Sequence, residues 1–235
     1  DQEIDQADIS SLIFTPAAND YGAAYDSFQF KVHDGMDYSA AAFTMTVDVT
    51  AVNDAPVGLP VISGSAVEDE TLTADTAGIS DIDGLGAFTY QWLRDGIAIA
   101  GATASTYTLG DADVGAQITV VASYTDDQST SESVTSAPTA AVTNVNDAPT
   151  ITSNGGGAAT SINVAENATA VTTVTATDLD GDTPTFSITG GADSTRFSID
   201  LNSGALTFNS APDFESPTDS NGDNVYVVEV TASDG

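Results

Sequence analysis

The chain has 235 residues and a formal net charge of −32, because 35 acidic residues face three basic residues and a single histidine. A surface so acidic repels other polyanions, which excludes nucleic acid and anionic membranes as partners and favours cations. The chain has no cysteine, which excludes disulfides, zinc–thiolate sites and thiol catalysis. Among the devices that stiffen small extracellular domains, this composition favours calcium.

Hydrophobic residues make up 41% of the chain, enough to build cores, so we expect a folded protein rather than a disordered acidic one. No apolar run approaches about 18 residues, and no basic and apolar signal segment opens the sequence. We therefore expect no membrane insertion in this segment and no visible Sec signal, and export by another route stays open.

Strand-like stretches, rich in β-branched and aromatic residues, follow one another and are separated by Gly, Asn, Asp and Ser. In chain order they are 43–52, 89–93, 117–124 and 225–232. No stretch of about twelve residues shows the 3.6-residue apolar period of a helix. The sequence therefore predicts an all-β chain.

The pentapeptide Val-Asn-Asp-Ala-Pro occurs at 52–56 and again at 145–149. A spacing of about 90 to 100 residues is the length of one immunoglobulin-sized β-sandwich. Proline fixes its own φ and favours extended geometry in the residue before it, so each copy is predicted to be a short ordered connector. The connectors divide the chain into three predicted domains, at 1–52, 57–145 and 150–235.

Asp34 precedes Asp54 by the same number of residues as Asp127 precedes Asp147. The residues between the two members of each pair are predicted to form one loop and the last strand of a domain. The matching residue of the third domain is Asp234, next to the last residue given. We expect the third domain to lack its last strand and the first to be the C-terminal part of a repeat. A strand from a neighbouring molecule is the alternative for completing the third domain.

The middle domain carries Tyr-Gln-Trp at 90–92, Tyr-Thr-Leu at 107–109 and Asp-Ala-Asp-Val-Gly at 111–115 before a long predicted strand. This order resembles an immunoglobulin-like repeat of large bacterial surface adhesins of the RTX type. The resemblance implies that Trp92 is the core tryptophan of the third strand of a sandwich. The fold hosts many functions, so this match specifies function weakly.

The third domain resembles a cadherin repeat, and five motifs match in order over its length. They are Ala165-Glu166-Asn167, Asp178-Leu179-Asp180, the hairpin 197–208, Asp213-Phe214-Glu215 and Ala232-Ser233-Asp234. The first domain, with segments 14–20 and 27–35, resembles the tail of a cadherin-like tandem repeat. The resemblances together imply a tandem array of seven-strand immunoglobulin- or cadherin-like β-sandwiches joined by short calcium-binding connectors.

The cadherin resemblance also implies which residues bind calcium at each connector. Calcium prefers six to eight oxygen ligands from carboxylates, carbonyls and Asn side chains, and the implied residues are of these kinds. The set expected at the second connector is Glu68, Asp111, Asp113, Asn146, Asp147, Asp178, Asp180 and Asp234. The set expected at the first connector is Asn53, Asp54, Asp81, Asp83 and either Asp126 or Asp127. A further connector beyond Gly235 is expected to use Glu166, Asp213 and Glu215.

The middle domain departs from the cadherin pattern, with Thr125-Asp126-Asp127 in place of Ala-x-Asp, so its ligands are less sharply defined. Many Asp-Gly pairs, such as Asp95-Gly96, are typical of tight turns. The alternating acids 178–182 repel one another unless a cation offsets them, which favours a metal loop. The alternation at 219–223 lacks a distal Glu, so it favours a polar loop over an EF-hand-like calcium site.

The sequence offers little to an enzyme. His33 is the only histidine, and no cysteine or second histidine accompanies it, which argues against a catalytic triad or a histidine metal site. We interpret the chain as a non-catalytic, calcium-rigidified extender segment of a large bacterial adhesin, at the cell surface or secreted. The alternatives are a carbohydrate- or protein-binding cadherin-like module and a protomer of an extracellular fibre. The expected partners are calcium ions, neighbouring repeats and, in the last case, other copies of the chain.

Overall fold

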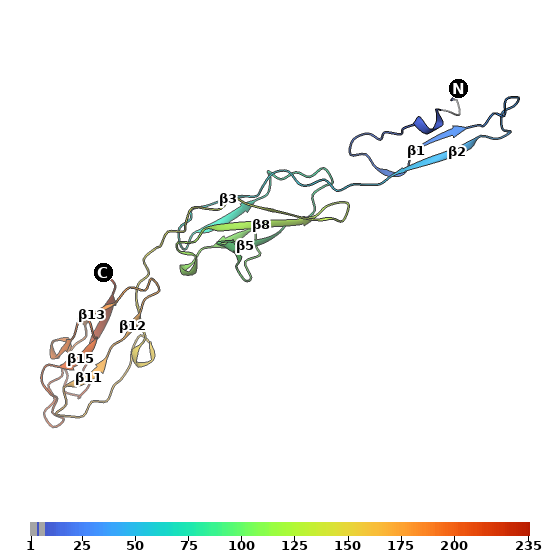
Figure 1. Cartoon of the computed structure of the whole chain (residues 1–235). Helices are drawn as coiled ribbons and strands as arrows, with labels where there is room; N and C mark the ends of the chain where they lie inside the picture. The colour runs from blue at the N-terminus through green and yellow to red at the C-terminus, as the bar shows by residue number, and fades with distance from the viewer. Residues whose placement is uncertain (1–3, 5–7) are drawn as a thin grey trace. The chain divides into compact units, whose positions relative to one another are not determined.

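A computed structural model describes residue 4 and residues 8–235, and its regular structure there is all-β (Figure 1). The helical elements of this part are four short 3₁₀ turns: η1 (Ile9–Ser11), η2 (Asp111–Asp113), η3 (Ser153–Gly155) and η4 (Ser194–Arg196). The all-β prediction is confirmed. Within the same residues, no helix is long and apolar enough to cross a membrane.

Residue contacts divide the chain into two compact units. The first contains Asp1–Ala66, Glu70–Thr108 and Ala116–Ala141. The second contains Val142–Gly235 together with two short segments from earlier in the chain, Val67–Asp69 and Leu109–Gly115. The domain boundaries predicted from the repeated pentapeptide stay a prediction.

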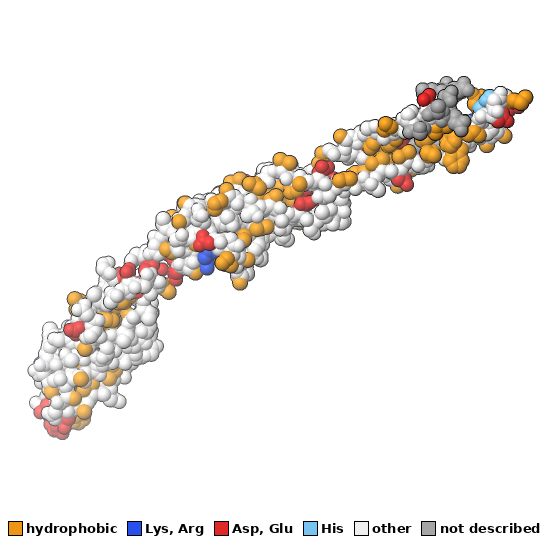
Figure 2. Space-filling view, in the orientation of Figure 1, with side chains coloured by type: hydrophobic (Ala, Val, Ile, Leu, Met, Phe, Trp, Pro, Cys, Tyr) orange, Lys and Arg blue, Asp and Glu red, His pale blue; other side chains and the backbone are white. Residues whose placement is uncertain are grey.

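The first unit begins with a two-stranded antiparallel sheet of β1 (Gly22–Phe30) and β2 (Phe43–Val49). Phe30 pairs with Phe43 and Phe28 with Met45, which places these four side chains on one face. Each of them is at least 38% exposed, and none of the described side chains of residues 11–50 is buried. Figure 2 shows the hydrophobic side chains gathered over this part of the chain.

Seven further strands of the first unit form two antiparallel sheets. One contains β3 (Val61–Ser63), β4 (Thr71–Asp75) and β7 (Thr106–Thr108). The other has the order β6-β5-β8-β9, with β5 at Thr89–Arg94, β6 at Ile97–Ala98, β8 at Ile118–Thr125 and β9 at Ser131–Thr135.

The core of these two sheets forms around Trp92 of β5, which is 0% exposed. Its ring stacks on Tyr107 of β7 at 5.8 Å between centroids, and its indole N–H donates to the Ala104 carbonyl at 2.9 Å. Strand β8 alternates buried and half-buried residues, so its inward positions line the same core. The two sheets therefore face each other as a β-sandwich, and the prediction that Trp92 is a core residue is confirmed.

The second unit contains three small antiparallel sheets. They are β10 (Thr150–Ile151) with β12 (Ala176–Thr177), β13 (Thr185–Gly190) with β16 (Glu229–Ser233), and β11 (Ala170–Thr173) with β15 (Ala205–Phe208) and β14 (Phe197–Ile199). The predicted hairpin 197–208 is confirmed as β14 and β15, which pair in antiparallel register. Phe197, Leu206 and Phe208 form the buried cluster of this unit.

The predicted strand 225–232 is present only from Glu229 onward, so its first half was wrong. Tyr226 and Val228 do pack against the buried cluster, which explains their apolar pattern. The backbone of Val227 bonds instead with Asp193: its N–H donates to Asp193 Oδ2 at 2.9 Å, and its carbonyl accepts from the Asp193 N–H at 2.9 Å. The side chain of a buried aspartate thus takes a place that a neighbouring strand would otherwise have.

Candidate metal site

Two short segments bring acids from the middle of the sequence into the second unit. Val67 forms a parallel bridge with Thr143, and Val114 forms one with Val142. The Glu68 N–H donates to the Thr143 carbonyl, and the Gly115 N–H donates to the Val142 carbonyl, both at 2.9 Å. The chain at 142–143 therefore runs beside both segments, which places Glu68 and η2 next to the start of the second connector.

Glu68 is almost completely buried, at 1% exposure. Its Oε2 accepts the Val145 N–H at 3.0 Å, whereas its Oε1 is buried and has no hydrogen-bond partner. The Val145 N–H lowers the pKa of Glu68, but a hydrogen bond with Asp111, burial and the charges of Asp111 and Asp147 together raise it above its ordinary value. A buried carboxylate oxygen without a donor is costly, and a cation is the partner that satisfies it.

Asp147 of the connector faces the acidic loop that follows β12. Its N–H donates to Asp180 Oδ2 at 2.7 Å. Burial, followed by the charges of Asp111, Asp180, Asp69 and Asp178, raises the pKa of Asp147. Four carboxylates therefore disfavour the ionised form of a fifth, as like charges do when no cation lies among them.

The loop 178–182 is folded around the first of its acids. Asp178 Oδ1 accepts the N–H groups of Asp180 at 2.9 Å and of Asp182 at 3.3 Å, as in a tight Asx turn. Asp178 Oδ2 is buried and has no hydrogen-bond partner. This loop can therefore be both a tight turn and part of a metal site, because one oxygen of Asp178 holds the turn and the other is available to bind a cation.

One oxygen each from Glu68, Asp147 and Asp180 lies within 4.8 Å of the others, a spacing that fits a shared cation. Asn146 Nδ2 donates to Asp234 Oδ2 at 2.8 Å, which brings two more predicted ligands to the connector. Asp113 is 1% exposed and caps η2, with its Oδ2 accepting the Gly110 N–H at 3.0 Å. The residues fit a hard, oxygen-seeking cation, because two buried oxygens of the group, Glu68 Oε1 and Asp178 Oδ2, have no protein donor.

A second group of three acids consists of Glu166, Asp213 and Glu215, and one oxygen of each lies within 4.8 Å of the others. Asn167 has a φ of 65° and donates its N–H to the Pro212 carbonyl at 2.9 Å. In the same way Asp69 has a φ of 64° and donates to the Leu109 carbonyl at 3.1 Å. This shared geometry supports an alignment of Glu68 with Glu166. Glu166, Asp213 and Glu215 are all exposed here.

The first connector has an arrangement of the same kind within the first unit. The Asp54 N–H donates to Asp83 Oδ2 at 2.6 Å, and the Asp83 N–H donates to Asp81 Oδ1 at 2.9 Å. Asn53 Nδ2, however, donates to Glu132 Oε1 at 2.7 Å, and the Tyr124 hydroxyl donates to Asp81 Oδ2.

Asp126 and Asp127, the two alternatives for this set, lie differently. A Cβ added at Gly84 would lie 2.3 Å from Asp127 Oδ2, so Asp127 packs directly against the acidic loop 81–84. Asp126 is 5% exposed, and its Oδ1 accepts the Thr130 N–H at 2.7 Å while its Oδ2 has no partner.

Comparison with solved structures finds distant structural similarity. Mouse cadherin-23 EC22-24 covers 86% of this chain at 18% identity and a TM-score of 0.35, with 66% of that chain covered. Protocadherin gamma B2 extracellular cadherin domains 3–6 covers 80% at 19% identity and a TM-score of 0.33, with 49% of that chain covered.

The chain is distantly similar in structure to tandem cadherin domains. It spans about half to two thirds of the length of these two chains, and the identities and TM-scores are too low to assign a function. No family model matches the sequence, and no curated protein matches it.

Sequence reasoning missed several residues that the structure brings to the two connectors. Asp69 follows Glu68 directly and adds charge near Asp147, and adjacency to a predicted ligand was the available signal. Tyr124 and Glu132 reach the first connector as neighbours across β8 and β9. The alternation along β8 could have placed Tyr124 on the inner face, but its partner Asp81 depends on the register of strands far apart in sequence.

The loop 219–223 is satisfied by its own backbone. Asp219 accepts the Asp223 N–H at 2.9 Å and the Asn224 N–H at 3.2 Å. Burial raises the pKa of Asp219, but these and other backbone N–H groups together hold it below its ordinary value. This arrangement favours the polar-loop interpretation over a calcium loop.

Proposed function

We propose that this chain is a calcium-rigidified extender segment of a large bacterial adhesin, exposed at the cell surface or secreted, and that it has no catalytic role. The observation that carries the proposal is the Glu68 carboxylate, which is buried beside Asp147 and Asp180 with one oxygen unpartnered. A surface tuned only for solubility has no reason to bury acids against one another. A site that takes a divalent cation has that reason.

In this mechanism calcium supplies the positive charge that the acids of the second connector lack. Glu68 offers Oε1 while its Oε2 holds the Val145 N–H. Asp147 and Asp180 offer oxygens from the connector and from the loop after β12. The segment that carries Glu68, the connector and the loop after β12 are thereby bound to the same calcium ion. The connector then loses its freedom to bend.

The energies are modest but sufficient for a hinge. Extracellular calcium modules bind with dissociation constants of about 0.1 to 1 mM, so millimolar calcium stabilises the bound conformation by about 0.4 to 1.4 kcal/mol per site. That range corresponds to a shift of about twofold to tenfold in the ratio of fixed to bent connectors. Coupled sites along an array multiply the effect.

Calorimetric titration of the whole chain with calcium tests the proposal. Asp180→Asn should weaken the tightest binding step by about tenfold or remove it, because ligand charge tunes calcium affinity. Glu70→Gln is the matched control, since Glu70 is exposed and lies two residues from Glu68. No calcium binding by the unaltered chain in the millimolar range would overturn the proposal.

A second candidate, a protomer of an extracellular fibre, is favoured by one observation. The face of β1 and β2 that carries Phe28, Phe30, Phe43 and Met45 is apolar and exposed, so it needs a covering layer. A second copy of the chain or a further segment of the same protein would supply it. Sedimentation over a range of concentrations distinguishes the candidates, because a fibre protomer self-associates through this face and an extender does not.

A further inference from the structure

The two connectors share their backbone arrangement but differ in what the carboxylates face. In each, the Asp of the pentapeptide donates its N–H to the second acid of an Asp-x-Asp loop, and that acid donates its N–H to the first. At the second connector the other oxygen of the first acid, Asp178 Oδ2, is buried without a partner. At the first connector the corresponding oxygen, Asp81 Oδ2, accepts the Tyr124 hydroxyl.

The second acid of the loop shows the same contrast. Asp83 Oδ1 accepts the side-chain amide of Gln128, and its Oδ2 accepts the Asp54 N–H. Asp180 instead lies with Glu68 and Asp147 in the group whose oxygens are within 4.8 Å. No such group of three acids occurs at the first connector among the residues that the structure describes. Protein donors thus satisfy Asp81 and Asp83 at the first connector, whereas Asp178 of the second one has a buried oxygen without a donor. Asp126 Oδ2, beside the first connector, is also buried without a partner and lies outside this loop.

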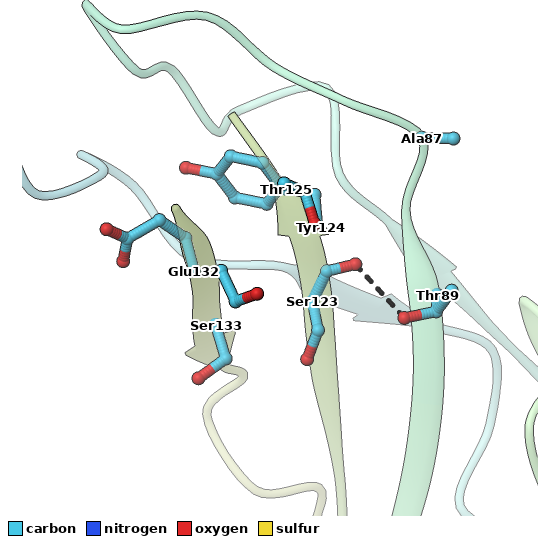
Figure 3. A pocket seen from close by; sticks show the side chains of 8 residues that line it. Ala87, Thr89, Ser123, Tyr124, Thr125, Glu132 and Ser133 are labelled. Carbon is cyan, nitrogen blue, oxygen red and sulfur yellow. Dashed lines mark hydrogen bonds between the residues drawn. The ribbon is translucent and has the colours of Figure 1, made fainter. Parts of the chain in front are cut away.

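The end of the β8–β9 hairpin supplies these donors. Tyr124 pairs with Glu132 across the two strands, and Figure 3 shows their side chains pointing to the same side. The Tyr124 ring packs on Phe88 at 5.1 Å and is 4% exposed, so its hydroxyl is held in place.

The second connector has no counterpart of this tyrosine. Thr231 precedes Asp234 by the same number of residues as Tyr124 precedes Asp127. Its hydroxyl bonds with that of Thr189 at 2.7 Å, on the neighbouring strand β13. Asn146 bonds with Asp234, whereas Asn53 bonds with Glu132 on the hairpin. The first connector therefore has a tyrosine hydroxyl that donates to its acidic loop, and the corresponding Thr231 near the second connector bonds elsewhere.

We infer that Tyr124, together with Gln128 and Glu132, holds the first connector in place without a cation, so that the two connectors of this chain differ in calcium dependence. The inference deepens the proposed function and rests on it, since it needs the second connector to depend on calcium. Tyr124 acts here as a positioning residue for the Asp81–Asp83 loop. Removal of calcium then loosens the chain at 145–149 while 52–56 stays ordered.

Backbone ¹⁵N relaxation of the whole chain, in calcium and after metal removal, tests the inference at Asp54 and Asp147. Ordered backbone has an order parameter near 0.85 and flexible backbone one below about 0.6. We expect Asp147 to change from the first value to the second on metal removal, and Asp54 to stay near 0.85. In Tyr124→Phe, Asp54 should fall below about 0.6 in metal-free protein and return to the ordered value in calcium, because the freed Asp81 oxygen can then take a cation.

Rescue by calcium separates positioning from general damage, since a merely destabilised fold stays loose in both conditions. Tyr90→Phe is the matched control, because Tyr90 is a half-buried tyrosine on the neighbouring strand β5 and should leave Asp54 unchanged. An unaltered chain in which Asp54 loosens together with Asp147 overturns the inference and leaves the proposed function standing. If Asp147 of the unaltered chain stays rigid without metal, both the proposed function and the difference between the two connectors are overturned. If Asp54 stays rigid in metal-free Tyr124→Phe, the role of Tyr124 is overturned.

Discussion

At the scale of single residues, Glu68 links burial to function. Its side chain is 1% exposed, yet only one of its oxygens has a donor within the protein. Asp147 and Asp111 raise its pKa further, so the ionised form is held against both burial and like charge. An acid in this position lowers the stability of the fold without a cation and raises it with one. The change in stability on its substitution should therefore have opposite signs in the two conditions.

Glu68→Gln should therefore have opposite effects in two conditions. In metal-free protein the neutral amide relieves repulsion, and the melting temperature of the second unit should rise by about 2 to 4 °C. In millimolar calcium the same change removes a ligand, so the rise in melting temperature that calcium produces should shrink by a similar amount. Differential scanning calorimetry in both buffers gives the two values, with exposed Glu70→Gln as the control. A loss of stability of equal size in both buffers would mean that Glu68 is only a packing residue.

Acidification should stabilise the metal-free second unit over the range just above the ordinary carboxyl pKa of about 4. The pKa values of Glu68 and Asp147 are raised, so the folded state binds more protons than the unfolded state in this range. Stability is then greatest near the ordinary pKa and falls as the pH rises through the raised values. Asp200 of the same unit has a pKa lowered by the backbone N–H and the hydroxyl of Ser203, so its contribution is lost only at still lower pH.

Unfolding of metal-free protein by urea at several pH values between about 4 and 7 measures this slope. Calcium should flatten or reverse it, because calcium binds the deprotonated acids and its stabilisation weakens as the pH falls. Stability that rises steadily with pH in metal-free protein would contradict the assignment of Glu68 and Asp147 as mutually repelling acids.

At the scale of elements, Asp193 organises the segment before β16. It is 3% exposed and accepts the Ser220 N–H at 2.6 Å and the Val227 N–H at 2.9 Å. Asp193→Ala leaves two N–H groups without their acceptor and should cost about 2 kcal/mol or more of unfolding free energy. The cost, measured by urea unfolding, should be the same with and without calcium. A cost that appears only in calcium would reassign this region, with the neighbouring loop 219–223, as a metal loop.

The strands show how far sequence reasoning reaches. The predicted strands near Phe43, Trp92 and Val120 are present because each combines β-branched and aromatic residues with a partner strand nearby. The stretch 225–228 has the same composition, but the Asp193 side chain bonds the backbone that a ladder would need. Composition indicates where apolar side chains pack, and it does not show which group takes the backbone hydrogen bonds.

At the scale of the whole molecule, the structure brings three of the predicted ligands close together, and their role as ligands stays a prediction. Glu68, Asp147 and Asp180 come from segments far apart in sequence, and motif resemblance nevertheless placed them together. The resemblance could not show that Tyr124 and Gln128 cover the loop at the first connector, since that depends on how the hairpin end meets it. Local motifs recur between repeats, whereas contacts between loops vary with each pair of neighbours.

Small-angle scattering of the whole chain, in millimolar calcium and after metal removal, is the most direct test of the central claim that calcium stiffens the second connector. We predict that the maximum dimension shrinks or its distribution broadens when metal is removed, because the acids of the second connector then repel one another and release it. Asp147→Asn and Asp180→Asn should produce the metal-free profile in calcium, and Glu70→Gln should not. Identical profiles of the unaltered chain with and without calcium would contradict the account and reduce these acids to turn residues.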